Sequence, residues 1–399
     1  MSVDVSDEAQ LDAAIAEHDL VISLIPYTHH ATVIKSAVKH KKHVVTTSYV
    51  SPAMMEYDQQ CKDAGVVCLN EVGLDPGIDH FYALKTIDEV HREGGKIKSF
   101  VSFCGGLPAP EASNNPLGYK FSWSARGVLM ALMNDAKFWE NGQIVNIAGK
   151  DLMKSAKPIF VYPAFALVGY PNRDSSIYKE RYNIPEAQTV IRGTLRFQGF
   201  PEFVKALVDI GFLDTTEQEF LSKSSTEPLT WNVLTARLVG ANPANAGELL
   251  AAVSARIQTN DQELRERIIH GIHWLGITSS TIQVAKRGTY LDTLCARLEE
   301  LMMYGPGERD MVILQHKFGV ENADGTNEVR TSTLVDYGFP NGYTSMARTV
   351  GIPCGIATQM ILDGKISTAG VLAPMTPDIY VPIMDALVGE NIYCVEEKF

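Results

Sequence analysis

The chain has 399 residues, of which 45% are hydrophobic and 21% are charged, and its formal net charge is −12 at pH 7. This composition is that of an ordinary globular protein, and the length predicts two or three domains whose cores need no disulfides or structural metals. The acidic balance and the lack of a basic run in the sequence argue against a nucleic-acid-binding surface.

The termini and the cysteines point to a protein without membrane or disulfide features. The polar, acidic start Met1–Gln10 does not fit a signal peptide, and no apolar run in the sequence approaches the ~20 residues of a membrane span. The six cysteines show neither a C-x-x-C motif nor paired spacing, so we expect neither a zinc site nor a disulfide framework. A reducing, cytoplasmic compartment fits this cysteine usage best.

Strand and helix patterns alternate over residues 1–95. Strands are expected at Ser2–Asp7, Asp19–Pro26, His43–Thr46 and Val66–Leu69, and helices at Glu8–Glu17, His29–His40 (capped by Thr28) and Pro52–Ala64 (capped by Ser51). These repeated units predict a parallel, right-handed, doubly wound α/β sheet of the Rossmann type. The sequence nevertheless contains no G-x-G-x-x-G motif. Either the domain is of another kind, or the chain begins partway through one.

Three successive strand ends carry small polar groups or turns, at Ile25–Tyr27, Thr46–Tyr49 and Gly73–Pro76. The carboxyl ends of parallel strands meet at one edge, where ligands bind in open α/β sheets, so we expect a binding crevice there. Asp75 lies on an Asp-Pro-Gly turn before a helix over Phe81–Ile87. It could orient a cation or relay a proton, or it could simply accept hydrogen bonds within its own loop.

Two other residues near this crevice carry transferable protons. Tyr49 follows the second strand, and Cys104 ends a β-rich run over Lys96–Cys104. For each residue alone, a core tyrosine or a buried structural thiol is the alternative interpretation.

Irregular spacing after Gly94-Gly95 predicts a second, α+β domain over residues 96–200 and 306–340. A loop is expected at Gly105–Pro116, a helix at Arg126–Met133, and strands at Ile144–Ile147, Thr189–Phe197, Asp310–Val320 and Glu328–Val335. Residues 201–305 predict a helical subdomain, with helices at Glu202–Ile210, Thr230–Val239, Ala246–Ile257, Asp261–His273 and Thr289–Met302. An apolar helix at Thr344–Asp363, within residues 341–375, is expected to pack back onto the first sheet, and residues 376–399 form a C-terminal helix and tail.

Arginines in the second domain are candidate anion ligands. Arg173 lies in a polar loop, and Arg192, Thr194 and Arg196 alternate along one face of a strand. The planar guanidinium binds carboxylates bidentately, so converging arginines would indicate a polycarboxylate ligand; ion pairs with nearby acids are the alternative. His270 and His273 lack a Glu or Cys at metal-site spacing, so no metal site is expected. His29 and His30 are expected to be solvated.

Seven motifs along the chain closely resemble the saccharopine reductase family, the NADP-dependent, L-glutamate-forming saccharopine dehydrogenases. They are Leu24–Thr28, Val45–Tyr49, Asn70–His80, Cys104–Pro110, Asn115–Ser124, Tyr170–Ser175 and Arg192–Pro201. The resemblance implies that glutamate condenses with L-2-aminoadipate 6-semialdehyde and that NADPH reduces the imine to saccharopine, in lysine biosynthesis by the α-aminoadipate route. A homodimer is also expected from the family.

The resemblance also implies roles for individual residues. The NADP(H) side would be lined by Leu24, Ile25, Thr47, Ser48, Leu74, Asp75, Pro76, Trp123 and Ser124. Saccharopine would be held by Ser48, Tyr49, Asp75, Arg173, Thr194, Leu195 and Arg196. The proton-handling, catalytic groups would be Tyr49, Asp75 and Cys104. Positioning of the imine against the nicotinamide would account for most of the rate enhancement.

The chain departs from the family at its start, where a strand and a Gly-rich turn are expected and absent. Roughly 50 residues of a βαβ unit would precede Met1, so we expect an N-terminally truncated nucleotide domain that binds NADPH weakly or not at all. Two other interpretations remain open. One is the lysine-releasing saccharopine dehydrogenase activity, which the Asp-Pro-Gly and Tyr-Pro-Asn-Arg-Asp motifs argue against. The other is a catalytically silent fragment that binds only a dicarboxylate or a partner.

Overall fold

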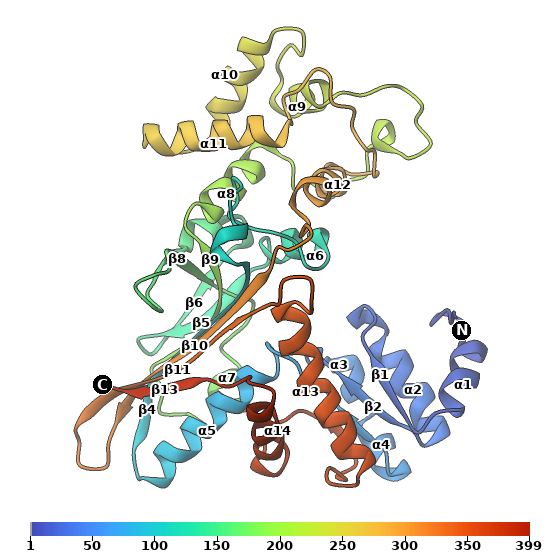
Figure 1. Ribbon diagram of the computed structural model, residues 1–399, viewed down its shortest axis with the longest axis vertical. Helices are drawn as coiled ribbons and strands as arrows, with labels where there is room; N and C mark the ends of the chain where they lie inside the picture. Colours follow the sequence, from blue (N-terminus) through green and yellow to red (C-terminus); the bar gives the residue numbers. More distant parts are fainter. Residues whose placement is uncertain (1) are drawn as a thin grey trace. The chain divides into compact units, whose positions relative to one another are not determined.

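Four parallel strands form the first sheet, in the order β1 (Leu20–Ser23), β2 (His43–Thr46), β3 (Val67–Leu69) and β12 (Gly370–Leu372). The computed structural model describes residues 2–399 (Figure 1). The predicted parallel, doubly wound sheet is therefore present. Its fourth strand comes from the far end of the sequence and pairs in register with β3, Gly370 opposite Val67.

The helices of the N-terminal segment follow the predicted pattern with one split. They are α1 (Glu8–Ala16), the 3-10 turn η1 (Tyr27–His29), α2 (His30–His40), α3 (Pro52–Met55), α4 (Asp58–Ala64) and α5 (Ile78–Arg92). Ser51 caps α3, since its hydroxyl accepts from the Met54 amide at 3.3 Å. The expected single helix Pro52–Ala64 divides before Asp58, and Thr28 is not the cap of α2, whose N-cap residue is His29.

The strand expected at Ser2–Asp7 is not formed. Asp4 accepts from the Ser6 amide, and Asp7 accepts from the Ala9 and Gln10 amides, so these carboxylates form a turn and cap α1 instead. Aspartate side chains commonly compete with strand pairing in this way. Leu11 and Ile15 of α1 pack into a buried cluster with Val33, Ile34 and Val44.

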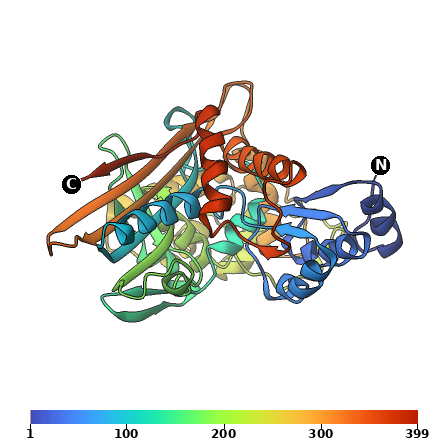
Figure 2. The same ribbon diagram turned by 90° about the horizontal axis from the view of Figure 1, so that it is seen from below.

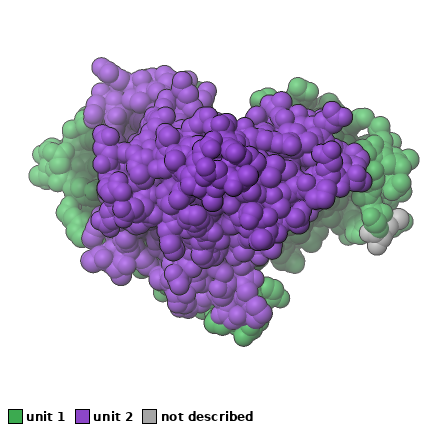
Figure 3. Space-filling model, turned by 90° about the horizontal axis from the view of Figure 1, so that it is seen from above, with its two compact units in different colours: residues 1–104, 178–187, 314–399 green, residues 105–177, 188–313 purple. Residues whose placement is uncertain are grey.

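Two compact units divide the chain (Figure 3). Unit 1 holds residues 1–104, 178–187 and 314–399, and unit 2 holds residues 105–177 and 188–313. In unit 1, helix α13 (Ser345–Leu362) packs against β1 and β2, and α14 (Pro377–Gly389) packs against α5 and α13. Unit 1 also holds the short helix α7 (Tyr178–Arg181), which lies inside the range that the sequence assigned to the α+β domain.

The second sheet has nine strands, and its first four lie in the order β13 (Val395–Lys398), β11 (Asn327–Tyr337), β10 (Asp310–Glu321) and β4 (Lys96–Pro108). Figure 2 shows the C-terminal strand β13 running beside the long hairpin of β10 and β11. The tail expected at residues 376–399 thus ends in a strand, with Thr333 opposite Val395. β4 continues past Cys104 to Pro108, where the sequence predicted a loop. Gly105 permits this because a Cβ there would lie 2.8 Å from Leu195 Cβ, so only glycine fits.

Unit 2 joins antiparallel strands to helices around one core. Its strands are β5 (Ala136–Glu140), β6 (Gln143–Ile147), β7 (Lys157–Ile159), β8 (Leu167–Pro171) and β9 (Thr189–Phe197). Its α-helices are α6 (Ala125–Ala131), α8 (Phe200–Ile210), α9 (Trp231–Val239), α10 (Ala246–Arg256), α11 (Gln262–Leu275) and α12 (Tyr290–Met302).

A single buried cluster runs through unit 2 and includes Phe121, Leu129, Phe203, Trp231 and Leu298. The helices of residues 201–305 therefore share their core with the preceding strands, whereas the sequence set them apart as a subdomain. Among residues 2–399, no helix has both the length and the apolar composition needed to cross a membrane.

Candidate functional site

Tyr49 and Asp75 meet at the carboxyl ends of two neighbouring strands of the parallel sheet. The Tyr49 hydroxyl donates to Asp75 Oδ1 at 2.7 Å, and both side chains are partly buried. The turn that carries Asp75 is closed by the Gly73 amide, which donates to the Pro76 carbonyl at 2.9 Å. Gly77 is required there, because its φ is +148° and a Cβ would lie 2.0 Å from the Gly73 carbonyl oxygen.

The ends of the first two strands are joined by a buried histidine. His30 Nδ1 lies 2.8 Å from the Ser23 hydroxyl, and His30 Nε2 lies 2.8 Å from the Ser48 hydroxyl. Burial, followed by the neighbouring His29, lowers the pKa of His30, so the neutral ring is favoured. The expectation that His30 is solvated is wrong, since the ring is fully buried between two strand ends. Two of the three polar strand ends that the sequence singled out are thus linked directly, through Tyr49 and Asp75, and His30 ties the second to Ser23 at the end of β1 rather than to Ile25–Tyr27.

Residues expected on the cofactor side differ in their exposure. Leu24 follows β1 with 66% of its surface exposed, and Ile25, Thr47 and Ser48 are partly exposed. Leu74 and Pro76 are buried, and Leu74 is 4% exposed. In unit 2, the exposed Trp123 ring packs over Gly127, and the Ser124 hydroxyl caps α6 by accepting from the Gly127 amide.

Arg196 is a buried cation on β9. Its guanidinium lies over the Tyr119 and Phe200 rings, at 4.8 and 5.2 Å from their centroids, and donates to the Leu195 carbonyl at 2.7 Å. Within the described residues, its Nε is buried without a hydrogen-bond partner. Burial raises the pKa of the neighbouring Tyr170 hydroxyl, although the charge of Arg196 opposes this shift.

The other predicted substrate residues of unit 2 lie along the β8–β9 pair. Thr194 is opposite Tyr170, Arg196 is opposite Val168, and Leu195 is fully buried in the core. The exposed Arg173 lies beyond the end of β8 with a left-handed φ of +52°. Arg173 and Arg196 therefore lie at different points along the strand pair. Cys104 is 8% exposed on β4, which belongs to a different sheet from Tyr49 and Asp75.

A buried network beside Tyr49 was missed by sequence reasoning. Glu71 Oε2 accepts from His80 Nε2 at 2.8 Å and from the Arg181 guanidinium at 2.9 Å, and His80 Nδ1 lies 2.6 Å from the Tyr182 hydroxyl. Burial alone would raise the pKa of Glu71, but His80, Arg181 and the Val50 amide lower it to about 2. Glu71 and His80 lie in the motif Asn70–His80, whereas Arg181 lies 110 positions away from Glu71 and carries no signal of its own.

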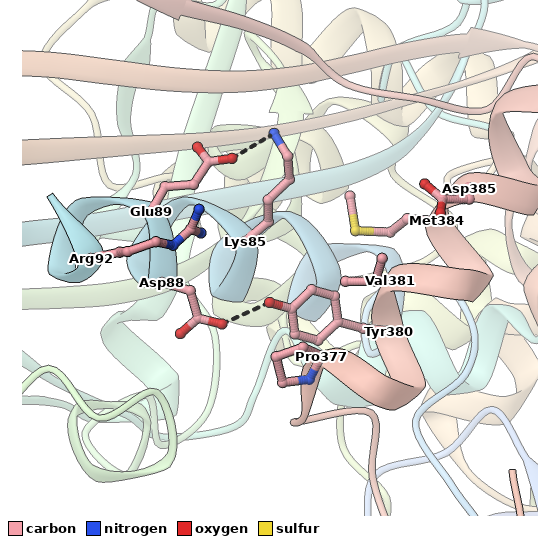
Figure 4. A pocket seen from close by; sticks show the side chains of 9 residues that line it. All are labelled: Lys85, Asp88, Glu89, Arg92, Pro377, Tyr380, Val381, Met384 and Asp385. Carbon is pink, nitrogen blue, oxygen red and sulfur yellow. Dashed lines mark hydrogen bonds and ion pairs between the residues drawn. The ribbon is translucent and has the colours of Figure 1, made fainter.

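A groove between α5 and α14 encloses a volume of about 440 Å³ (Figure 4). Lys85, Asp88, Tyr380 and Met384 are among its lining residues, and the Tyr380 hydroxyl donates to Asp88 at 2.7 Å. None of the predicted site residues lines this groove. Among residues 2–399, no cluster of His, Cys, Asp and Glu could hold a metal ion.

Family models match nearly the whole chain. The saccharopine dehydrogenase NADP binding domain matches residues 1–69, and the saccharopine dehydrogenase C-terminal domain matches residues 73–392.

Individual relatives agree with these matches. The chain is 60% identical to saccharopine dehydrogenase [NADP(+), L-glutamate-forming] of Schizosaccharomyces pombe and 57% identical to the Saccharomyces cerevisiae protein of the same name; in both cases the match covers 100% of this chain and 88% of the relative. The mitochondrial alpha-aminoadipic semialdehyde synthase of Bos taurus is 40% identical over 96% of this chain and 41% of the relative. The structure of apo, histidine-tagged saccharopine dehydrogenase (L-Glu forming) from Saccharomyces cerevisiae superposes with a TM-score of 0.93 at 56% identity, covering 100% of this chain and 89% of the other.

Proposed function

The chain belongs to the saccharopine dehydrogenase family, and on that premise we propose that it interconverts saccharopine with glutamate and L-2-aminoadipate 6-semialdehyde, using NADP(H). In the direction of synthesis, the glutamate amine and the aldehyde lose water to form an imine, which takes up a hydride and a proton. The observation that carries the proposal is the Tyr49–Asp75 hydrogen bond at the carboxyl edge of the parallel sheet. This edge is where ligands bind in open α/β sheets.

Tyr49 and Asp75 would handle protons at the reacting nitrogen and at the departing water. The amine must lose a proton before it attacks the aldehyde, and the carbinolamine must gain one before water leaves. A phenol hydrogen-bonded to a carboxyl group at 2.7 Å offers a donor and an acceptor side by side. The thiol of Cys104 is the third candidate, on a different sheet of the same unit.

In unit 1, Leu24, Ile25, Thr47 and Ser48 would contact the cofactor; in unit 2, the family resemblance alone assigns this role to Trp123 and Ser124. In unit 1, the exposed apolar side chain of Leu24 fits a flat nicotinamide ring, and the Ser48 hydroxyl, bonded to His30, fits a polar edge. The turn after β1 contains no glycine, so we assign no residue to the phosphates. When bound, NADPH supplies the hydride.

Carboxylate recognition would fall to the arginines of unit 2. Saccharopine carries three carboxylates, and the buried Nε of Arg196 leaves the guanidinium with unused donor capacity. The rings of Tyr119 and Phe200 hold its plane fixed, which suits bidentate binding. Arg173, with its exposed side chain, would contact a second carboxylate. Thr194 would contribute a hydroxyl, and the buried Leu195 only its backbone.

The proposed function extends to the pathway, the compartment and the oligomeric state. We place the reaction in lysine biosynthesis and in the cytoplasm, supported by six cysteines that form no disulfide within residues 2–399. A homodimer rests on the family resemblance alone. Cell fractionation tests the compartment, and sedimentation of the purified protein tests the dimer.

The test of the proposed function is a spectrophotometric assay with saccharopine and NADP+. We expect absorbance of NADPH to appear together with stoichiometric glutamate and aldehyde. NADP+ should be preferred over NAD+. Formation of lysine in place of glutamate, or binding of saccharopine without turnover, would overturn the proposal.

A further inference from the structure

Glu71 contacts both chain neighbours of Tyr49. Its backbone amide donates to the Ser48 carbonyl at 3.2 Å, and its side-chain Oε1 accepts from the Val50 amide at 2.9 Å. Its φ is +59°, in the left-handed region that residues other than glycine rarely adopt. Such a conformation persists where surrounding contacts impose it, and these strained residues concentrate at functional sites.

The carboxylate of Glu71 is buried but fully compensated. Its side chain is 0% exposed, yet it accepts from His80 Nε2 and from the Arg181 guanidinium at 2.8 and 2.9 Å. A carboxylate can only accept, so His80 Nε2 must carry a proton. The His80 ring is stacked on Tyr178, whose face also receives Arg181 at 5.3 Å. Removing one partner of such a buried, hydrogen-bonded charge is strongly destabilising, because the remaining charge is left buried without compensation.

The same cluster also holds the turn that carries Asp75. Asp79 Oδ1 accepts from the Gly77 amide at 2.6 Å, and Asp79 Oδ2 lies 3.6 Å from His80 Nδ1. The Asp79 amide donates to the Leu74 carbonyl at 3.0 Å. His80 therefore contacts two carboxylates with different roles. Glu71 holds the segment that contains Tyr49, and Asp79 holds the turn that contains Asp75.

We propose that Glu71 is a positioning residue that, with His80 and Arg181, holds the Tyr49 hydroxyl on Asp75 and acts on the reaction only through Tyr49. This inference rests on the proposed function for its kinetic consequences, although the geometry is independent of it. Glu71 itself would touch no reacting atom. Because a displacement of about 1 Å can cost ~10²-fold in rate, a loosened segment should lower kcat strongly.

The kinetic test is a double-mutant cycle with Glu71→Gln and Tyr49→Phe. We expect Glu71→Gln to lower kcat by tenfold or more, with KM for saccharopine changed less than threefold. In the Tyr49→Phe background, Glu71→Gln should cause no further loss, because the group that it positions is gone. Equal losses in both backgrounds would show a general structural role and overturn the inference.

Glu186 offers a matched control in the same unit. Its carboxylate accepts from His91 Nε2 at 2.8 Å and from the Ile97 amide at 3.1 Å, the same kinds of partner as those of Glu71. Glu186→Gln should leave kcat and KM unchanged, both in the wild type and in the Tyr49→Phe background. A loss in Glu186→Gln equal to that in Glu71→Gln would mean that any broken carboxylate–histidine pair has this effect, and would also overturn the inference.

Hydrogen exchange separates this inference from the proposed function. Exchange of the Val50 amide should speed up at least tenfold in Glu71→Gln and stay unchanged in Glu186→Gln. If the wild-type protein does not turn over saccharopine, the proposed function fails, and this exchange result alone decides the positioning role. Unchanged exchange in Glu71→Gln would overturn it. Should Glu71→Gln not fold, Tyr182→Phe removes one bond to His80 and should accelerate the same amide.

Discussion

The Tyr49 hydroxyl donates to Asp75 Oδ1 at 2.7 Å, which joins the ends of β2 and β3 through a phenol and a carboxyl group. The backbone supports the same junction, because the Val72 amide donates to the Thr46 carbonyl and the Glu71 amide to the Ser48 carbonyl. The two side chains therefore form one chemical unit rather than two separate sites.

Removing either partner should lower the rate far more than it lowers binding. We expect Tyr49→Phe and Asp75→Asn each to reduce kcat by about 10²-fold, the usual contribution of a positioned acid or base. The double variant should lose little more than either single one, since the two groups act together. Steady-state kinetics in both directions measures this. Losses that multiply in the double variant would show that the two residues act separately.

Arg196→Lys should weaken saccharopine binding. A lysine keeps the charge but loses the flat fork and the stacking on Tyr119 and Phe200, so we expect KM for saccharopine to rise roughly tenfold with kcat little changed. Arg237→Lys is the control, because Arg237 also lies over a ring, that of Phe220 at 4.3 Å. Equal KM values in the two variants would contradict the assignment of Arg196.

Acid should remove the stability that Glu71 contributes. Its pKa is about 2 in the fold against an ordinary value of 4.5, so the contribution is present above pH 4.5 and is lost as the pH falls toward 2. That difference corresponds to roughly 3 kcal/mol, of which about 2 kcal/mol is gone by pH 3. The gap in unfolding free energy between the wild type and Glu71→Gln, measured by urea unfolding, should narrow accordingly. A gap that stays constant from pH 6 to pH 3 would contradict this ionisation.

His30 predicts a second pH effect at milder acidity. Burial holds the pKa of His30 below the ordinary 6.5. The contribution of its neutral ring to the stability of the fold is therefore present above pH 6.5, and it is lost as the pH falls through the lower pKa that His30 has in the folded protein. Thermal unfolding midpoints of the wild type should therefore fall more steeply between pH 7 and pH 5 than those of His30→Gln. His18→Gln, at an exposed ring bonded to the Ala14 carbonyl, is the control and should follow the wild type. Parallel curves for His30→Gln and the wild type would refute the neutral, buried ring.

Local patterns predicted the strands and helices well. β2 (His43–Thr46) and β9 (Thr189–Phe197) match their expected bounds to the residue, because β-branched runs there end at turn-forming residues. β8 was missed because a proline ends its short apolar run, and β13 was missed because its charged, exposed residues show no apolar face. In both strands, pairing with a neighbour outweighs weak local propensity.

In the candidate site, too, local sequence patterns predicted some residues, whereas others depend on partners that only the fold brings together. Tyr49, Ser48 and Asp75 could be predicted because strand ends of a parallel sheet converge on one edge. Glu71 and His30 could not, since their roles depend on partners brought by the fold, such as Arg181 and the Ser23 hydroxyl. No sequence period marks a left-handed glutamate or a histidine between two serines.

The most direct measurement is the reduction of NADP+ by saccharopine, followed through the absorbance of NADPH, with the wild type beside Tyr49→Phe. We expect turnover by the wild type with glutamate as a product, and a loss of about 10²-fold in kcat for Tyr49→Phe. Equal rates for the two proteins, or a wild type that binds saccharopine without producing NADPH, would contradict it.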